Sequence, residues 1–355
     1  MPIDRIIITA DLLRPFAHDP TRSESLRRIR WFEDLLRPVL EAVVDLPIER
    51  LACEGDLELE SLYDAAGSVP CMESWAELFA GELTPTLKDR LLGLCDNAMV
   101  ISTELPPSIA HTLMDAGVPV VDCINDPLRF LDDIPLSWRT TEDEVRARFE
   151  RFRLSAFDVA AGVGRIKAKT RWMPELPVPE GATLLLGQVW ADGALVDPVR
   201  RRMVWWDDYG DALAEISARG PIVWRPHPYH SIQAAPVPHV HDDARLAAAN
   251  FYQLLSHDNL AGVAAISSGG VVEARAFGKR GQHLLDRTAG IRFPQWGTPV
   301  PVLGHWVSPH FWSHVLAPLV PVRSGVPEVP VEKNFFRRSI NCDWDFGWID
   351  RVVAL

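Results

Sequence analysis

The sequence predicts an α/β protein built from two Rossmann-like domains with a cleft between them. Short apolar runs alternate with helix-length amphipathic segments in both halves of the 355-residue chain, and a proline-rich segment separates the halves. The length suits two domains of ordinary size. Ligands of such folds bind beyond the carboxyl ends of the parallel strands, so we expect the functional residues at strand ends.

Composition and charge exclude several classes of protein. Apolar residues make up 47% of the chain and charged residues 24%, the balance of a soluble globular protein. No apolar run reaches the roughly 20 residues that a membrane span requires. The first residues lack the basic flank and cleavage site of a signal peptide, so a cytoplasmic location is expected. The net charge of −12 argues against bulk binding of nucleic acid.

In the first half, apolar runs predict strands at Ile6–Ala10, Arg50–Cys53, Ala98–Ser102 and Pro119–Asp122. Amphipathic helices are expected between them, and a continuous helix over residues 140–171. The segment WMPELPVPEGA (172–182) holds three prolines and a glycine, which is typical of a linker. Residues 1–171 are therefore assigned to an N-terminal domain and 172–182 to the linker.

The second half repeats the alternation. Strands are expected at Thr183–Leu186, Pro221–Trp224, Gly262–Ile266 and residues 282–286. Helices are expected over residues 207–220 and 244–257, and from about Val271. Residues 183–330 are assigned to a C-terminal domain. The segment 331–355 has no clear strand, and a helix there could pack back on the first domain.

The segment VAAISSGGVVEARAFGK predicts a buried strand, a small-residue turn and a helix. Ser267, Ser268, Gly269 and Gly270 let backbone approach a ligand, and free N–H groups at a helix start attract anions. Glu273 follows in the first helical turn, where it could bind a ribose hydroxyl or cap the helix. An ordinary strand-to-helix turn explains the same residues equally well.

The segment PIVWRPHPYHS predicts a strand that ends in Arg225, Pro226, His227 and Pro228. Because proline fixes φ, the two prolines hold His227 stiffly beyond the sheet edge. Histidine and arginine both bind phosphate, and arginine also binds carboxylate. A rigid loop whose histidine bonds only to backbone is the alternative.

Acidic residues follow three other predicted strands. Asp192 lies shortly after Gly187-Gln188, where it would face the cleft as a base or nucleophile, although Asp-Gly also favours a plain turn. Glu104 lies just beyond a strand and before a Pro-Pro helix start. The segment CINDPLRFLDDIP follows another strand and contains Asp126, Arg129, Asp132 and Asp133. Helix capping and a solvated acidic loop explain the last two segments equally well.

No metal site is expected. The five cysteines are scattered without a CxxC pair, which excludes a disulfide framework or a zinc knuckle. Asp343-Trp344-Asp345 matches a metal-binding DxD, but no strand precedes it. The three histidines of residues 305–314 have no familiar zinc spacing, so packing or substrate contacts are expected of them.

In chain order, GQVWAD, RPHP and SSGGVVEARAFGK resemble the C-terminal half of bacterial capsule-type Kdo (3-deoxy-manno-octulosonic acid) transferases. These are GT-B enzymes that use CMP-activated Kdo. TELPP and DPLRFLDD are similar to first-domain segments of retaining β-Kdo transferases. The HP and serine motifs also resemble those of bacterial CMP-sialic acid transferases. The chain departs from the family in EARAFGKRGQHLL, where Arg280 replaces a proline.

The resemblance implies a GT-B fold and a role for each matching residue. Asp192 would attack the anomeric carbon, Glu104 would activate the acceptor hydroxyl, and His227 would hold the CMP phosphate. The other donor-site residues implied are Gln188, Arg225, Pro228, Ser267, Ser268, Gly269, Gly270, Glu273 and Lys279. Sugar or acceptor contacts are implied for Asp126, Arg129 and Asp132. Either Arg225 or Arg129 would pair with the sugar carboxylate, and Lys279 would stabilise leaving-group charge.

The implied partners are a CMP-activated sugar and a glycan of the bacterial surface, such as capsule or lipopolysaccharide. A lipid-linked acceptor would add peripheral contact with the inner membrane. No metal or other cofactor is implied, because CMP leaves with a single phosphate. Two alternatives stay open: a GT-B enzyme for CMP-sialic acid or a UDP- or GDP-sugar, and a non-catalytic module that binds glycan or nucleotide.

Overall fold

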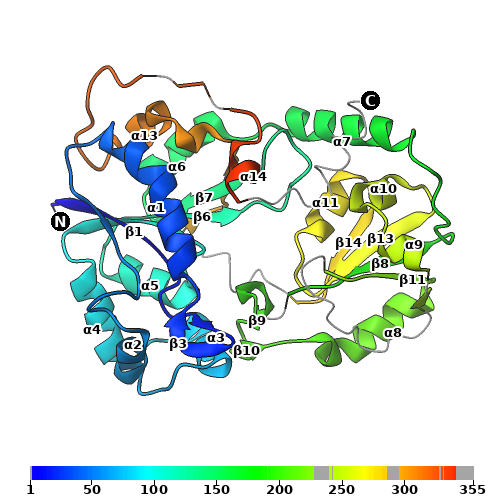
Figure 1. Ribbon diagram of the computed structural model, residues 1–355, viewed down its shortest axis with the longest axis horizontal. Helices are drawn as coiled ribbons and strands as arrows, with labels where there is room; N and C mark the ends of the chain where they lie inside the picture. The colour runs from blue at the N-terminus through cyan, green and yellow to red at the C-terminus, as the bar shows by residue number, and fades with distance from the viewer. Residues whose placement is uncertain are drawn as a thin grey trace.

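A computed structural model of the chain describes residues 2–189, 191–227, 240–241, 243–285, 296–327, 329–330 and 332–340. It is a mixed α/β structure in which two large sheets lie side by side (Figure 1). Two small two-stranded sheets accompany them, β2 (Pro15–Phe16) with β3 (Asp19–Ser23), and β9 (Val196–Asp197) with β10 (Arg202–Met203).

The first sheet has six strands in the order β15-β7-β6-β5-β1-β4. The strands β4, β1, β5 and β6 are parallel, whereas β7 and β15 run antiparallel to their neighbours. In chain order they are β1 (Arg5–Ala10), β4 (Ile48–Arg50), β5 (Ala98–Thr103), β6 (Val120–Asn125), β7 (Leu136–Thr140) and β15 (Val300–Val302).

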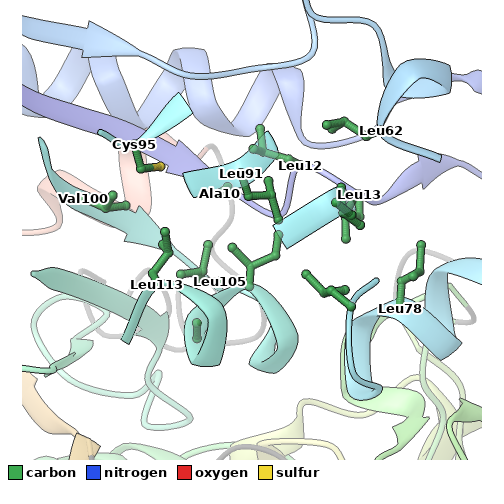
Figure 2. Close-up of a cluster of buried hydrophobic side chains, with 14 of the residues drawn as sticks. Ala10, Leu12, Leu13, Leu62, Leu78, Leu91, Cys95, Val100, Leu105 and Leu113 are labelled. Atoms are coloured by element: carbon green, nitrogen blue, oxygen red, sulfur yellow. The ribbon is translucent and has the colours of Figure 1, made fainter. Parts of the chain in front are cut away.

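Helices cover both faces of this sheet, so its strands read as continuous apolar runs. Ile7 packs in the cluster shown in Figure 2, on the side of α2 (Leu59–Ala66), α3 (Met72–Ala80), α4 (Pro85–Leu94) and α5 (Pro107–Asp115). Ile6 and Ile8 point to the other face, which is covered by α1 (Leu26–Glu41), α6 (Asp143–Phe149) and α13 (Pro309–Leu316). Because side chains alternate along β1, this strand contributes apolar side chains to two cores, one on each face of the sheet.

The second sheet has five parallel strands in the order β12-β11-β8-β13-β14. They are β8 (Ala182–Leu186), β11 (Ile222–Arg225), β12 (Val240–His241), β13 (Leu260–Ala265) and β14 (Arg280–His283). One face packs against α7 (Ala156–Thr170), α9 (Ala244–Ala247), α10 (Phe251–Ser256) and α11 (Gly270–Ala276), and the other against α8 (Gly210–Ala218). Its central strands, β11, β8 and β13, carry the predicted nucleotide-site motifs at their carboxyl ends.

Two of the predicted helices are interrupted. The segment 140–171 was expected to be one helix, but β7 ends at Thr140, and α6 and α7 are separate helices joined by η1 (Glu150–Phe152). Ser155 starts α7 afresh, since its hydroxyl accepts from the N–H of Asp158 at 3.1 Å. In the segment 244–257, Asn250 caps α10 by accepting from the N–H of Tyr252 at 3.0 Å. Side-chain caps therefore divide both segments.

The units of the structure differ from the assigned domain limits. Residues 183–330 were assigned to the second domain, but β15 pairs with β7 in the first sheet and α13 packs on that sheet. Conversely, α7 was assigned to the first domain, but Val163 and Ile166 lie in the core of the second sheet. The chain thus crosses between the sheets before α7 and again before β15.

The C-terminal helix α14 (Phe335–Ser339) lies against the first sheet. Phe336 packs on Trp31 and Trp306, and the buried Asp133 carboxylate accepts from the N–H groups of Phe336 and Arg337 at 2.9 and 3.0 Å. The Arg337 guanidinium donates to the carbonyls of residues 129 and 131, at 2.8 and 3.1 Å. This helix therefore fixes the loop between β6 and β7. Within the described part of the chain, no helix combines the length and apolarity needed to cross a bilayer.

A buried ion pair joins β6 to β7. Arg139 Nε donates to Asp122 Oδ2 at 2.8 Å, and Ser102 Oγ donates to Oδ1 at 2.7 Å. Asp122 is 0% exposed and Arg139 4%. We expect Asp122→Ala to lower the free energy of unfolding by about 3–5 kcal/mol, because it leaves a buried guanidinium without its counter-charge.

Urea unfolding of this variant would be compared with that of Asp45→Ala, which breaks the exposed Asp45–Arg323 pair. The control should cost less than about 1 kcal/mol. Equal losses in the two variants would contradict the role assigned to the buried pair.

Candidate functional site

Two cavities open at the carboxyl ends of the strands. The smaller is partly open to solvent and lies where β8, β11 and β13 end. It is lined by Arg129, Leu186, Gly187, Arg225, Pro226, His227, Phe251, Tyr252, Ser268, Gly270 and Glu273. The larger cavity is a cleft between the first sheet and the loop after β8. We call the two the small cavity and the cleft.

The turn after β13 is held by Gln188, which is buried. Gln188 Nε2 donates to Ser267 Oγ, and the N–H of Ser267 donates to Gln188 Oε1, both at 2.7 Å. Ser268 lines the small cavity, and its Oγ accepts from the N–H of Gly270 at 3.3 Å. The two hydrogen bonds from Gln188 thus fix the turn at Ser267, while the next residue, Ser268, lines the small cavity.

Glycine is required at two positions around this turn. A Cβ on Gly270 would lie 2.6 Å from Leu186 Cδ1 and 3.0 Å from Phe251 Cζ. A Cβ on Gly187 would lie 2.7 Å from the backbone nitrogen of His227. The ends of β8, β11 and β13 therefore meet at contact distance, and the small cavity forms where their loops converge.

Arg225 and His227 reach the small cavity from the end of β11. The guanidinium of Arg225 lies 5.8 Å from the ring centre of Phe251, and its Nε donates to the carbonyl of Ala249 at 3.4 Å. His227 lines the cavity opposite Ser268 and Gly270. The cavity thus combines a guanidinium, an imidazole and a hydroxyl, a donor set suited to an anion. Pro228 lies outside the described residues.

Glu273 is buried at the floor of the small cavity, where it joins the two sheets. Its Oε1 accepts from the N–H of Arg129, in the first half, at 2.8 Å, and from the hydroxyl of Tyr252 at 2.9 Å. Burial raises the pKa of Glu273 to about 7, although Arg129 and these hydrogen bonds act in the opposite direction. Arg129 thereby reaches a cavity that is otherwise built by the second half.

Glu104 and Asp192 both line the cleft. Glu104 follows β5 with a left-handed φ of +53°, an uncommon conformation for a residue with a side chain. Arg28 forms an ion pair with Glu104, and Asn125 Nδ2 donates to Glu104 Oε1 at 3.3 Å. The pKa of Arg28, which burial alone would lower, is raised by Glu104 and by three more carboxylates, Asp192 among them. Arg28 is therefore close enough to interact electrostatically with both Glu104 and Asp192.

The loop after β8 carries Asp192 across to the first half. Arg14 donates to the carbonyl of Ala191, and a Cβ on Gly193 would lie 3.3 Å from the ring of Phe79. Asp192 Oδ1 accepts from the N–H of Ala194 at 2.9 Å and caps a short 3-10 helix. Asp192 therefore both forms a turn with Gly193 and lines the cleft, so the two alternatives considered for it are compatible.

Six of the predicted site residues line neither cavity: Gln188 and Ser267, which hold the turn after β13, and four others. Lys279 lies beyond the far end of α11, where its Nζ donates to the carbonyl of His257 at 2.8 Å. The carboxylate of Asp126 is buried and accepts from Ser137 Oγ at 2.6 Å and from the N–H of Leu128 at 2.9 Å. Asp132 is half exposed and pairs with Arg165 at 2.7 Å. Gly269 is covered by Pro127, whose Cβ would lie 3.0 Å from an added Cβ.

Each of these four residues has contacts that explain its position in the fold. Lys279 closes a helix end on the side of the sheet away from the cavity, because it directly precedes β14. Asp126 shapes the loop that carries Arg129, and burial raises its pKa. Asp132 holds α7 to that loop, and Gly269 lets the loop approach the serine turn.

Arg28, Tyr252 and Phe251 line the cavities but were not predicted from the sequence. Arg28 lies in the first turn of α1, where it reads as an ordinary surface residue of an amphipathic helix. Tyr252 and Phe251 look like core positions of a helix, and they reach the small cavity because Asn250 restarts α10 beside it. Strand ends alone do not identify such residues.

The three histidines of residues 305–314 surround Phe152, with ring centres 5.5 to 6.4 Å from it. They pack in an aromatic group on the first sheet. Over the described ranges, no group of three or more His, Cys, Asp or Glu side chains is arranged to hold a metal ion. Asp343 and Asp345 lie outside those ranges.

No protein-family model and no curated protein matches the chain. Among solved structures, it is similar to a KpsC beta Kdo 2,7 transferase of Thermosulfurimonas dismutans, with 13% identity and a TM-score of 0.37 over 78% of this chain and 76% of that one. It is also similar to a KpsC beta Kdo 2,4 transferase of that organism, with 14% identity and a TM-score of 0.31 over 52% and 68% of the two chains.

The raised pKa of Glu273 predicts a pH-dependent stability that Glu273→Gln removes. Between pH 4.5 and about 7 the folded state keeps a proton that the unfolded state releases, so the stabilisation is complete below pH 4.5 and is lost as the pH rises through 7. We expect wild type to lose on the order of 2 kcal/mol relative to the variant between pH 5 and 8.

Urea unfolding of both proteins at four pH values measures this difference. Asp11, whose pKa burial raises to about 6, titrates in both proteins and cancels. A difference in stability that stays constant from pH 5 to pH 8 would contradict the assignment.

Proposed function

We propose that the chain is a glycosyltransferase of the GT-B arrangement that transfers Kdo, or a related 2-keto sugar acid, from a CMP donor to a glycan. The observation that carries this proposal is the convergence of the RPH and SSGG segments in the small cavity, beside a cleft that contains Asp192 and Glu104. A nucleotide site and a pair of carboxylates in adjoining spaces are what glycosyl transfer requires.

The donor set of the small cavity fits a nucleoside monophosphate. The phosphate would lie between His227 and Ser268, where Gly270 keeps the turn free of side chains. Phe251 and Tyr252 offer an apolar wall for a base, and Glu273 an acceptor for a ribose hydroxyl. One phosphate carries less charge than a diphosphate, so an imidazole and backbone or hydroxyl donors stabilise it as a leaving group without a metal.

The sugar would extend from the small cavity towards the cleft. The two spaces adjoin at the loop after β8, since Gly187 lines one and Val189 lines the other. Arg225 and Arg129 border the small cavity, where either guanidinium can pair with the sugar carboxylate. With the donor bound in this way, the anomeric carbon would lie on the side of the loop that carries Asp192.

Two displacements then account for transfer with retention of configuration. An Asp192 oxygen attacks the anomeric carbon, and the bond to the phosphate oxygen breaks, so that CMP leaves with the electron pair. The acceptor hydroxyl, which loses its proton to Glu104, attacks the same carbon and releases Asp192. The ion pair with Arg28 holds Glu104 at the cleft, where the acceptor hydroxyl would lie.

The proposed acceptor is a glycan bound in the cleft, such as a capsule or lipopolysaccharide chain, whose lipid anchor would bring the protein to the inner face of the inner membrane. Phe16 and Trp31 line the cleft, and exposed aromatic side chains suit the apolar faces of sugars. The cytoplasmic location expected from the sequence fits this acceptor.

Transfer from CMP-Kdo to a Kdo-terminated oligosaccharide tests the proposal. We expect Asp192→Asn to reduce turnover on the order of 10³-fold or more, because it removes the nucleophile and keeps the shape of the turn. His227→Ala should raise the KM for the donor. Asp132→Asn is the matched control, since Asp132 lines neither cavity, and it should keep wild-type turnover.

Thermal unfolding with nucleotides separates the donor classes. CMP should raise the Tm of wild type and not that of His227→Ala, whereas UDP and GDP should leave both unchanged. Full turnover in Asp192→Asn, or stabilisation by UDP instead of CMP, would overturn the proposal in this form.

A further inference from the structure

The outer face of α7 differs from the rest of the surface. The helix buries Val163, Ile166 and Thr170 against the second sheet and turns its opposite face to solvent along the edge of the molecule (Figure 1). On that face Phe157 is 78% exposed, and Trp172, just beyond the helix, is 88% exposed. Large aromatic side chains that are exposed together on one face of the surface are typical of an interaction site.

These aromatic residues mark the ends of one apolar ridge. The ridge consists of Phe157, Ala161, Gly164, Ala168 and Trp172, which recur at the spacing of a single helical face. The three ridge residues between Phe157 and Trp172 are small, so the aromatic rings project furthest from the helix. At 1.5 Å per residue the ridge is about 22 Å long.

Cationic side chains flank the ridge on both sides. Arg165 lies on one side and pairs with Asp132, while Lys167 and Arg171 lie on the other. Lys167 Nζ lies 5.9 Å from the ring centre of Phe277 and donates to the Phe277 carbonyl at 3.1 Å. In a chain with a net charge of −12, this face is locally basic.

A shallow hollow lies between the last turn of α7 and Trp172. It is lined by Gly164, Lys167, Ala168, Arg171 and Trp172. Gly164 and Ala168 form its floor, and a Cβ added to Gly164 would meet nothing within 4 Å. The hollow is therefore an open space with two cations and an indole at its rim, a combination that suits a phosphate attached to an apolar chain.

We infer that this face of α7 docks on an anionic lipid bilayer, with a lipid phosphate in the hollow and Phe157 and Trp172 at the level of the headgroups. Aromatic rings favour the membrane–water interface, and cations beside an apolar stripe are the mark of an interfacial helix. A protein partner is less suited, because a specific interface buries about 800 Å² per partner and the ridge is one helix wide, with small residues at its centre.

This inference goes beyond the proposed function, since binding to vesicles requires no sugar donor. Failure of vesicle binding would leave transfer in solution untouched, and loss of transfer would leave vesicle binding untouched. The two proposals therefore fail separately.

Sedimentation with vesicles of phosphatidylcholine, with and without phosphatidylglycerol, tests the inference on the full chain. Wild type should bind the anionic vesicles, more weakly as salt rises, and the neutral vesicles far less. Gly164→Glu places a negative charge in the hollow and should weaken binding at least about fivefold. Phe157→Ser with Trp172→Ser should weaken it on the order of tenfold.

Each variant has a matched control. Gly93→Glu changes the net charge equally, at an exposed helical glycine of α4 that also has open space around it, and should bind as wild type does. Val69→Ser with Val199→Ser removes two exposed apolar side chains elsewhere. Thermal unfolding checks that all variants fold.

Three results would overturn the inference. The first is no binding of wild type to anionic vesicles, which would point to a protein partner for this face. The second is equal weakening by Gly164→Glu and Gly93→Glu, which would reduce the effect to net charge. The third is equal binding to neutral and anionic vesicles, which would remove the role of the cations.

Discussion

The two sheets are joined at the site by one buried carboxylate. Glu273 projects from the second half and accepts from the backbone of Arg129 in the first half, so the loop between β6 and β7 lies against the serine turn. The same loop is held from behind by Arg337 of α14, whose guanidinium donates to the carbonyl of Arg129 at 2.8 Å. The small cavity exists because this loop is fixed from both sides, and a proton on Glu273 is part of that contact near pH 7.

The loop after β8 contributes residues to both cavities. Gln188 turns inward and holds Ser267 by two hydrogen bonds, while Asp192 lies at the cleft, where Arg28 interacts electrostatically with both Asp192 and Glu104. Arg225, His227 and Ser268 thus lie in a different cavity from Asp192 and Glu104. In the proposed reaction the sugar bridges the two spaces, with its leaving phosphate on one side and the attacking groups on the other.

The parts predicted from sequence are those set by local pattern. β1, β5, β8 and β13 lie within a residue or two of the apolar runs that predict them, because both faces of these strands are buried. RPH and SSGG meet since β11 and β13 flank β8, which follows from a parallel sheet with motifs at strand ends. β7 was missed because its buried Arg139 makes sense only beside Asp122, and β15 because it joins a sheet whose other strands end 160 residues earlier. The contacts of Asp126 with Ser137 and of Asp132 with Arg165 could not be predicted, because these partners lie 11 and 33 residues further along the chain.

The most direct measurement is a crystal structure of the protein with CMP. The account predicts the phosphate between the imidazole of His227 and the turn at Ser268, the ribose near Glu273, and the free phosphate oxygen directed towards the cleft. A nucleotide bound with its phosphate away from His227 and Ser268, or bound in the cleft with the small cavity left empty, would contradict the account.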